Sequence, residues 1–270
     1  MLPPKVSVIL LTFNRKKMLK EAIDSILSQT YRNLELIIVD NCSSDGTDKM
    51  VLSYKDPRIR YFRNQNNGII AANLNYGIKK AKGKYVAFCD DDDLWMPDKL
   101  EKQVKILEKE KEVSIVSTNG INFDENGEYG FCVKPRKSAY ISQRDILILN
   151  VIIHSSVMVR TKIFDEVGYF SEDPRYFSAE EYYLWLKILR NSKAYMIQEP
   201  LIKYRTHGGV YRSKGVRHLQ ILDRIVSDLY KSHYISKSNY GIFIAKQFLF
   251  YVVNLLRINV LYHKLGLKFY

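Results

Sequence analysis

Four consecutive aspartates, Asp90 to Asp93, directly follow the apolar run Tyr85–Cys89. Neighbouring carboxylates repel each other by about 1 kcal/mol per pair even in water, so packing gains nothing from this cluster. A hard divalent cation such as Mg²⁺ or Mn²⁺ removes the repulsion, because it takes carboxylate and phosphate oxygens together. Ligands of open α/β sheets bind where strands end. The cluster therefore predicts a metal site, and a solvated acidic turn before a helix opening at Pro97 is the alternative.

Another acid, Asp40, ends a second predicted strand, Leu34–Val39, and small polar residues follow it at positions 41–47. A carboxylate in this place can accept a hydrogen bond from a nucleobase imide or a ribose hydroxyl. Asx side chains also order turns through the neighbouring backbone, which is the alternative explanation for Asp40.

The first predicted strand, Val6–Leu11, leads into Thr12, Phe13, Asn14 and Arg15. The Phe13 ring can stack on a base, and Asn14 and Arg15 can reach a phosphate. A loop without a ligand is the alternative.

Small residues recur at the start of the next predicted helix and within it, in the run Asn66-Asn67-Gly68 with Ala71, Asn73 and Gly77. Such residues let a backbone approach a ligand closely, and a tightly packed helix needs the same residues.

Glu180 and Glu181 open another predicted helix. Acids in a first helical turn are favoured by the helix dipole, which is a purely structural explanation. The aspartate cluster suggests a second one, because a transfer reaction with a metal-bound diphosphate leaving group needs a carboxylate base on the opposite side.

Two hydrophobic periods alternate over the first 120 residues, with short β-rich runs separated by amphipathic helical patterns. Strand-helix-strand repetition with short links indicates βαβ units. We therefore predict an α/β fold with a mainly parallel central sheet and flanking helices. The predicted strands are Val6–Leu11, Leu34–Val39, Ile59–Phe62, Tyr85–Cys89 and Val113–Val116, and the predicted helices are 16–29, 47–54 after Ser44-Asp45, 68–81 and one from Pro97.

The pattern changes after residue 120, and two helical segments dominate from residue 216. We expect a catalytic domain over 1–212 and a helical extension over 213–270. The stretch 241–262 is broadly apolar, so it packs on the core, on a partner or at a membrane interface. Further predictions are a hairpin at Asn126-Gly127, a helix from Ser142, a strand over Ile152–Val159, and one polar stripe at Lys246, Asn254, Arg257 and Lys264.

The net charge of +13 is unevenly placed. Residues 201–270 hold twelve Lys and Arg but only two acids, a difference of +10. This asymmetry predicts an anionic partner, either phosphates or an anionic membrane surface. Nucleic acid is not expected, because no zinc-finger spacing or aromatic RNA-binding signature is present.

Three widely spaced cysteines in no CxxC pattern indicate a reducing compartment. No signal peptide and no run of about 18–20 apolar residues is recognised. We therefore expect a cytoplasmic protein, with the basic C-terminal region holding it at the inner face of a membrane.

Six motifs in this order resemble glycosyltransferase family 2, whose members have the GT-A type, Rossmann-like, nucleotide-sugar-binding fold. The resemblance runs from residue 5 to about 210. The motifs are Val6-Ser7-Val8-Ile9 with Thr12-Phe13-Asn14-Arg15; Ile38-Val39-Asp40-Asn41 with Ser44-Asp45-Gly46-Thr47; Asn67-Gly68 with Ala72-Asn73, Gly77, Ala81 and Gly83; Phe88 to Pro97; Glu180-Glu181; and Tyr204-Arg205-Thr206-His207.

The resemblance implies a role for most of these residues. Asp40 would bind uracil or an equivalent base, with Phe13 stacked on it. The family's DXD motif falls on Asp90-Asp91-Asp92, in which Asp92 is the principal metal ligand, Asp90 supports it, and Asp91 holds the ribose or assists the metal. Asp93 is expected to cap the next helix. His207, with Arg205 and Arg212 nearby, would close over the metal-diphosphate, with a neutral structural histidine as the alternative. His154 would lie beside the acceptor.

The family's catalytic base is usually the aspartate of a Glu-Asp pair, and Glu181 stands at that position here, with Glu180 as the alternative. The resemblance thus implies an inverting, non-processive hexosyl- or N-acetylhexosaminyl-transferase that uses a nucleotide-sugar, with UDP favoured, and Mg²⁺ or Mn²⁺. The acceptor would be a glycan or a lipid-linked sugar in cell-surface polysaccharide or glycoconjugate synthesis. A metal-dependent nucleotidyltransferase and a non-enzymatic module that binds anionic polymers are the competing interpretations.

Overall fold

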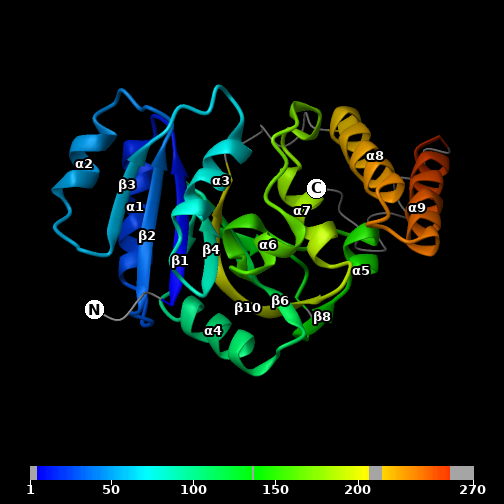
Figure 1. Cartoon of the computed structure of the whole chain (residues 1–270), viewed down its shortest axis with the longest axis horizontal. Helices are drawn as coiled ribbons and strands as arrows, with labels where there is room; N and C mark the ends of the chain where they lie inside the picture. The colour runs from blue at the N-terminus through cyan, green and yellow to red at the C-terminus, as the bar shows by residue number, and fades with distance from the viewer. Residues whose placement is uncertain (1–4, 136, 207–214, 256–270) are drawn as a thin grey trace.

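The computed structural model of the chain describes residues 5–135, 137–206 and 215–255. Within them, strands form one sheet, and each of its first three strands along the chain is followed by a helix (Figure 1). The strands are β1 Val6–Thr12, β2 Leu34–Asp40, β3 Ile59–Arg63, β4 Tyr85–Cys89, β5 Leu94–Trp95, β6 Val113–Asp124, β7 Gly127–Phe131, β8 Ala139–Ile141, β9 Met158–Arg160 and β10 Lys193–Arg205.

The strand order is β3-β2-β1-β4-β9-β6-β10-β5, with β7 paired to β6 and β8 to β10. Strands β1 to β4, β6 and β10 run parallel, whereas β5, β7, β8 and β9 are antiparallel to their neighbours. The predicted mainly parallel sheet with flanking helices is thus confirmed.

Helices cover both faces of the sheet, and each face has its own apolar core. Along β1, Val8 and Leu10 face one core and Ile9 faces the other, as the two-residue period of a strand requires. The helices are α1 Lys16–Leu27, α2 Thr47–Ser53, α3 Ile70–Lys80, α4 Lys99–Lys109, α5 Gln143–Ile148, α6 Ile163–Val167, α7 Glu180–Ile188, α8 Gly215–Lys231 and α9 Lys237–Leu255, with 3₁₀ turns at His154–Ser156 and Pro174–Tyr176.

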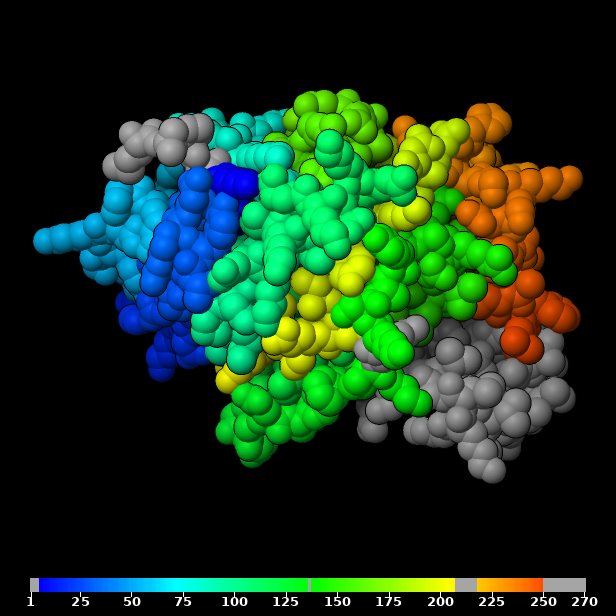
Figure 2. Space-filling model, turned by 90° about the horizontal axis from the view of Figure 1, so that it is seen from below, coloured from blue at the N-terminus to red at the C-terminus, as the bar shows by residue number. Residues whose placement is uncertain are grey.

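Buried residues of α1 and α4 belong to the first core, and those of α3, α5 and α7 belong to the second. Gly77 explains how α3 lies so close to the sheet, because a Cβ at this position would stand 2.8 Å from Cγ2 of Ile9. The tight-packing explanation therefore accounts for Gly77. In a view from below, part of β10 reaches the surface beside α4 (Figure 2).

The predicted strand over Ile152–Val159 is confirmed only at Met158 and Val159, and its earlier part is wrong. Its first half forms a 3₁₀ turn at His154–Ser156, and only Met158–Arg160 pairs with β4 and β6. The reason is polar: the Ser156 hydroxyl donates to the Ile153 carbonyl at 2.7 Å, which closes a local turn in place of a ladder bond. The predicted hairpin is confirmed between β6 and β7, and the helix from Ser142 is confirmed with a capping box.

Helices α8 and α9 pack on α5 and α7, at the end of the molecule opposite to α2 (Figure 1). Val226, Leu229 and Phe243 are buried in the second core. The Lys246 ammonium donates to the Leu147 carbonyl at 3.0 Å, so this polar position faces the body of the protein. No helix among the described residues is long and apolar enough to span a membrane. The expected boundary at 212/213 and residues 256–262 of the apolar stretch lie outside the described residues.

Candidate active site

The carboxyl ends of three parallel strands bring most of the predicted site residues to one edge of the sheet. Thr12 at the end of β1 is in register with Asp40 at the end of β2. On the other side, Leu10 of β1 is in register with Cys89, the last residue of β4. The aspartate cluster therefore begins beside the segment that follows β1, as predicted for strand ends in an α/β sheet.

Asp91 and Asp92 converge on one cation. Nη1 of Arg15 lies 3.0 Å from Oδ1 of Asp91 and 2.9 Å from Oδ2 of Asp92. The Thr12 hydroxyl donates to the other Asp91 oxygen at 2.8 Å. Burial raises the pKa of Asp91 to about 6, although the Thr12 hydrogen bond and the Arg15 charge act in the opposite direction. The two carboxylates are thus placed so that they bind one cation together.

Asp90 is fixed by the 3₁₀ turn that the sequence did not predict. The Ser155 hydroxyl donates to Oδ2 of Asp90 at 3.0 Å, and the Asp90 N–H donates to the same hydroxyl oxygen at 3.0 Å. Its neighbour His154 packs against Phe88 and Trp185, with ring centroids 5.0 and 6.5 Å away. Burial lowers the pKa of His154, and its Nδ1 atom has no hydrogen-bond partner.

Asp93 does not cap the next helix, because α4 begins at Lys99 after Asp98. Its Oδ1 accepts the Arg205 backbone N–H at 2.8 Å, and its buried Oδ2 has no hydrogen-bond partner. Burial, followed by the charges of Asp90 and Asp92, raises the pKa of Asp93 far above its usual range. Asp93 therefore has a structural role, because it ties the aspartate cluster to the backbone of β10.

Arg205 of β10 holds the turn formed by Asp90 to Asp93, the aspartate turn, in place. Its Nε donates to the Asp92 carbonyl at 2.8 Å, and its Nη2 pairs with Glu21 of α1 at 2.6 Å. In the structure Arg205 holds the turn formed by the aspartates, and its place near a diphosphate stays a prediction. His207 and Arg212 lie outside the described residues.

Asp40 is fully buried and serves the turn that follows it. One oxygen accepts the Ser43 N–H at 2.8 Å and the Ser43 hydroxyl at 2.6 Å, and the other accepts the Tyr61 hydroxyl at 2.5 Å. The turn-ordering explanation is thus realised, and contact with a base stays a prediction. Phe13 lies nearby with 52% of its surface exposed, as a stacking platform requires.

Asn14 links the ends of β1 and β2. It adopts a positive φ of 53°, its N–H donates to the Ser43 hydroxyl, and its Oδ1 accepts the Ser44 N–H at 2.8 Å. This arrangement positions its neighbours Phe13 and Arg15 at the edge of the sheet.

The segment between β3 and α3 closes over the end of β2. Asn67 and Gly68 both have positive φ, 51° and 82°, and the Asn66 N–H donates to Oδ1 of Asn41 at 2.8 Å. Helix α3 begins at Ile70, two residues after the predicted start at Gly68, so Gly68 lies with Asn67 in the loop before the helix. Asn73 is buried, and its Oδ1 accepts from Asn64, which gives it a packing role.

Glu180 and Glu181 open α7, as predicted, after Ala179. Residues four apart on a helix share one face, so Glu181 lies one turn before Trp185 on the same side. Trp185 packs on His154, whose neighbour Ser155 holds Asp90. Trp185, one turn after Glu181, is therefore connected to Asp90 through His154 and Ser155.

A divalent metal fits part of this arrangement. The described residues contain no group of three His, Cys, Asp or Glu side chains placed to cage a metal ion. Mg²⁺, however, is usually held by one or two carboxylates, with phosphates and waters completing its shell. Asp91 and Asp92 already share one cation, Arg15, so their oxygens are placed as such a pair.

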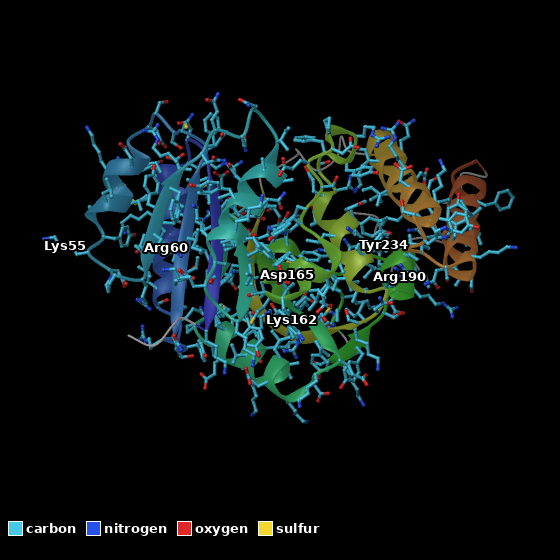
Figure 3. The ribbon with its side chains drawn as sticks, viewed as in Figure 1. Lys55, Arg60, Lys162, Asp165, Arg190 and Tyr234 are labelled. Atoms are coloured by element: carbon cyan, nitrogen blue, oxygen red, sulfur yellow. The ribbon has the colours of Figure 1, made fainter. Side chains whose placement is uncertain are left out.

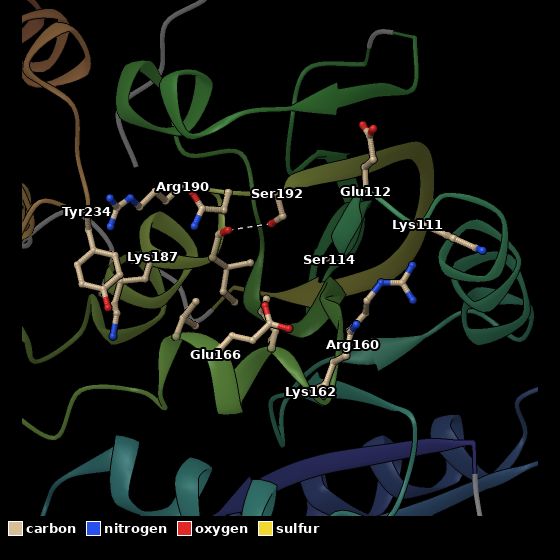
Figure 4. Close-up of a pocket in the computed structure, with 14 residues that line it drawn as sticks. Lys111, Glu112, Ser114, Arg160, Lys162, Glu166, Lys187, Arg190, Ser192 and Tyr234 are labelled. Atoms are coloured by element: carbon tan, nitrogen blue, oxygen red, sulfur yellow. Dashed lines mark hydrogen bonds between the residues drawn. The ribbon is translucent and has the colours of Figure 1, made fainter.

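A cavity of about 370 Å³ lies at the opposite edge of the sheet, where Arg160 of β9 is in register with Tyr85, the first residue of β4. Its lining is basic (Figure 4), but these charges serve the fold. Arg160 donates to three backbone carbonyls, and the Lys187 ammonium lies over the Tyr234 ring, 4.8 Å from its centroid. Arg190 lies beside the same ring (Figure 3). No predicted site residue lines this cavity.

The fold is that of an α/β protein with a mainly parallel sheet, and a cluster of carboxylates lies at the carboxyl ends of its strands. The sequence matches the profile of "Glycosyl transferase family 2" over residues 7–168. The chain belongs to this family. It is similar to an uncharacterized glycosyltransferase of Rickettsia typhi, at 35% identity over 233 residues that cover 84% of this chain and 72% of that protein.

A second relative is the UDP-Glc:alpha-D-GlcNAc-diphosphoundecaprenol beta-1,3-glucosyltransferase WfgD of Escherichia coli, 31% identical over 217 residues, 80% of this chain and 82% of that protein. Among solved structures, S. aureus TarS 1–349 in complex with UDP-GlcNAc has a TM-score of 0.72 at 19% identity, covering 91% of this chain and 73% of that one. The mannosyltransferase PcManGT from Pyrobaculum calidifontis, in complex with GDP-Man and Mn²⁺, has a TM-score of 0.66 at 22% identity, covering 90% and 69%. At these identities the structures show the fold alone.

Sequence reasoning missed Ser155 and the role of Arg205. Ser155 carried a signal, because the triplet His154-Ser155-Ser156 interrupts an apolar segment and all three side chains make buried or half-buried contacts. The role of Arg205 carried no local signal, since its partners lie more than 100 residues earlier in the chain.

Proposed function

We propose that the protein is an inverting glycosyltransferase that moves a hexosyl or N-acetylhexosaminyl group from a UDP-sugar to an acceptor hydroxyl. The observation that carries this proposal is the meeting of Asp91 and Asp92 at the end of β4 with Thr12 and Asp40 at the ends of β1 and β2. Family membership supplies the reaction class. The names of the Escherichia coli relative and of the TarS complex support UDP as the nucleotide.

In the proposed mechanism, Glu181 removes the proton of the acceptor hydroxyl while the sugar leaves its diphosphate. Asp92, supported by Asp90 and Asp91, would hold Mg²⁺ or Mn²⁺, which stabilises the charge of the departing diphosphate. Phe13 and Asp40 orient the base of the nucleotide, and Ser155 keeps Asp90 in place.

The test is sugar transfer or hydrolysis with a panel of UDP-sugars in the presence of Mn²⁺. Glu181→Gln keeps the size of the side chain and removes its basicity, so we expect turnover to fall by about 10²–10⁴-fold while UDP still binds. Glu180→Gln is the matched control, with turnover retained. If Glu181→Gln turns over at the wild-type rate, the base assignment is wrong, and release of pyrophosphate from a nucleoside triphosphate would indicate a nucleotidyltransferase instead.

We further propose a lipid-linked sugar acceptor and contact with the inner face of an anionic membrane. The acceptor proposal is supported by the diphosphoundecaprenol in the name of the Escherichia coli relative. Membrane contact is supported by α9, which exposes Ile244, Phe248 and Leu249, and by the excess of ten positive charges in residues 201–270. A cytoplasmic location is supported by Cys42, Cys89 and Cys132, which are all free thiols.

A further inference from the structure

Arg15 occupies the space between the two acids that the proposed function assigns to the metal. A single nitrogen, Nη1, contacts both Asp91 and Asp92, at 3.0 and 2.9 Å. The two carboxylates are largely buried, with 8% and 14% of their side-chain surface exposed. Charged groups with so little access to water need a nearby opposite charge, and Arg15 supplies it in the nucleotide-free chain.

A guanidinium and a divalent cation cannot share this position. Both would stand within about 3 Å of the same oxygens, and like charges at such short range repel strongly. The Arg15 side chain is 48% exposed, so it has room to leave without disturbing a packed core. Asn14 anchors the backbone beside it at the end of β1, so the side chain pivots from a fixed point.

We propose that Arg15 is an exchangeable counter-ion of the aspartate pair. In the nucleotide-free protein it neutralises Asp91 and Asp92 and so weakens the binding of a free metal ion. When a metal arrives with a nucleoside diphosphate, Arg15 leaves the carboxylates and pairs with the diphosphate. Arg15 thus makes metal binding and nucleotide binding mutually dependent. The metal takes the two carboxylates from Arg15, and the diphosphate of the nucleotide gives Arg15 a new partner. This inference rests on the proposed metal-dependent use of a nucleotide-sugar.

The experiment measures Mn²⁺ affinity by calorimetry on the full chain without nucleotide. Arg15→Gln removes the competing charge, so we expect Mn²⁺ to bind about 10-fold tighter, equivalent to about 1.4 kcal/mol. In saturating Mn²⁺, we expect the same variant to bind UDP about 10-fold more weakly. The opposite signs of these two changes distinguish an exchangeable counter-ion from a merely structural arginine, whose loss would weaken both ligands.

Arg63→Gln is the matched control. Arg63 ends β3 at the same edge of the sheet, and its guanidinium contacts the Ser43 carbonyl at 3.3 Å instead of the aspartates. Its loss also removes one positive charge from the protein, but none that contacts the aspartate pair, so a change in Mn²⁺ affinity below about threefold is expected there. Arg15→Lys keeps a charge in reach of the pair, and its Mn²⁺ affinity should stay close to that of the wild type.

Equal or weaker Mn²⁺ binding by Arg15→Gln, compared with Arg63→Gln, overturns the inference. Should Arg15→Gln fail to fold, Arg15→Met is measured in its place, with the same expectation. The proposed function is judged separately by sugar transfer from UDP-sugars. Transfer with unchanged metal affinity in the variants refutes only the counter-ion, whereas the predicted affinity changes without any transfer refute only the glycosyltransferase proposal.

Discussion

A lysine buried under the aspartate turn gives a prediction whose size follows from the structure. Lys99, the first residue of α4, is fully buried, and burial lowers its pKa to about 7. Its ammonium lies over the Trp95 ring, 3.6 Å from the centroid, and donates to Oε1 of Gln103 at 2.9 Å. Trp95 in turn donates to the Ser155 carbonyl, so the lysine supports the turn that holds Asp90.

The sign of the pH dependence follows from the direction of this shift. The folded-state pKa lies below the ordinary value of 10.5, so between these two values the unfolded chain binds a proton that the folded chain does not. Stability rises with pH wherever the unfolded state binds more protons. One pH unit inside this window corresponds to about 1.36 kcal/mol, so the Lys99 contribution improves by about 2 kcal/mol between pH 7 and pH 9.

The perturbation is Lys99→Met, which keeps the apolar stem and removes the titrating group. The substitution also removes the hydrogen bond from Lys99 to Gln103, which lowers the free energy of unfolding by about 1–3 kcal/mol. This loss is the same at both pH values, so it cancels when the two are compared. The assay is urea unfolding of wild type and variant at pH 7 and pH 9. The wild type should gain about 2 kcal/mol relative to the variant over this interval. Lys105→Met, an exposed position of α4, is the control. A stability difference that stays constant between the two pH values would refute the reasoning.

Three more predictions concern the site and the C-terminal helices. Asp92→Asn should weaken metal-dependent UDP binding by about 10-fold or more in calorimetry with Mn²⁺, whereas full metal-dependent activity would rule out its role as a ligand. Asp40→Asn should lower the free energy of unfolding by about 1–3 kcal/mol and should also weaken UDP binding, whereas Tyr61→Phe should lower stability alone. Equal UDP affinity in the two variants would mean that Asp40 only orders its turn. Phe248→Ser combined with Leu249→Ser should reduce sedimentation with phosphatidylglycerol vesicles at low salt, compared with Leu52→Ser on exposed α2, and a wild type that ignores these vesicles would contradict the membrane proposal.

The first half of the sheet could be predicted from the sequence because each of its strands has a recognisable local sequence pattern. Strands β1 to β4 are apolar runs bounded by polar turns, and parallel pairing with short connections leaves few arrangements open. The site at their carboxyl ends was predictable for the same reason, since strand ends in register bring Thr12, Asp40 and Asp90 to one edge.

The second half resisted prediction because tertiary contacts decide it. The sequence of strand β10 lacks the apolar alternation of a strand, because Glu199 and Pro200 interrupt it. The pairing of β10 with β6 shifts register near these two residues. The turn at His154–Ser156 is set by Asp90 and by aromatic rings from other elements, which no local pattern encodes. Arg205 reaches its partners only once the sheet is complete.

The fastening of the aspartate turn has a consequence for biosynthesis. Side chains that hold these aspartates come from Thr12, Arg15, Ser155 and Arg205, separated from their aspartates by up to 113 residues. Closing loops of this length is entropically costly, and domains fold only when the necessary segments have left the ribosome. The family profile ends at residue 168, before the last restraint is made. The aspartates of a nascent chain are therefore synthesised early, but they are held in place only after β10 has emerged. Premature termination before residue 205 would leave a protein that has the aspartates but lacks the Arg205 contacts that hold them.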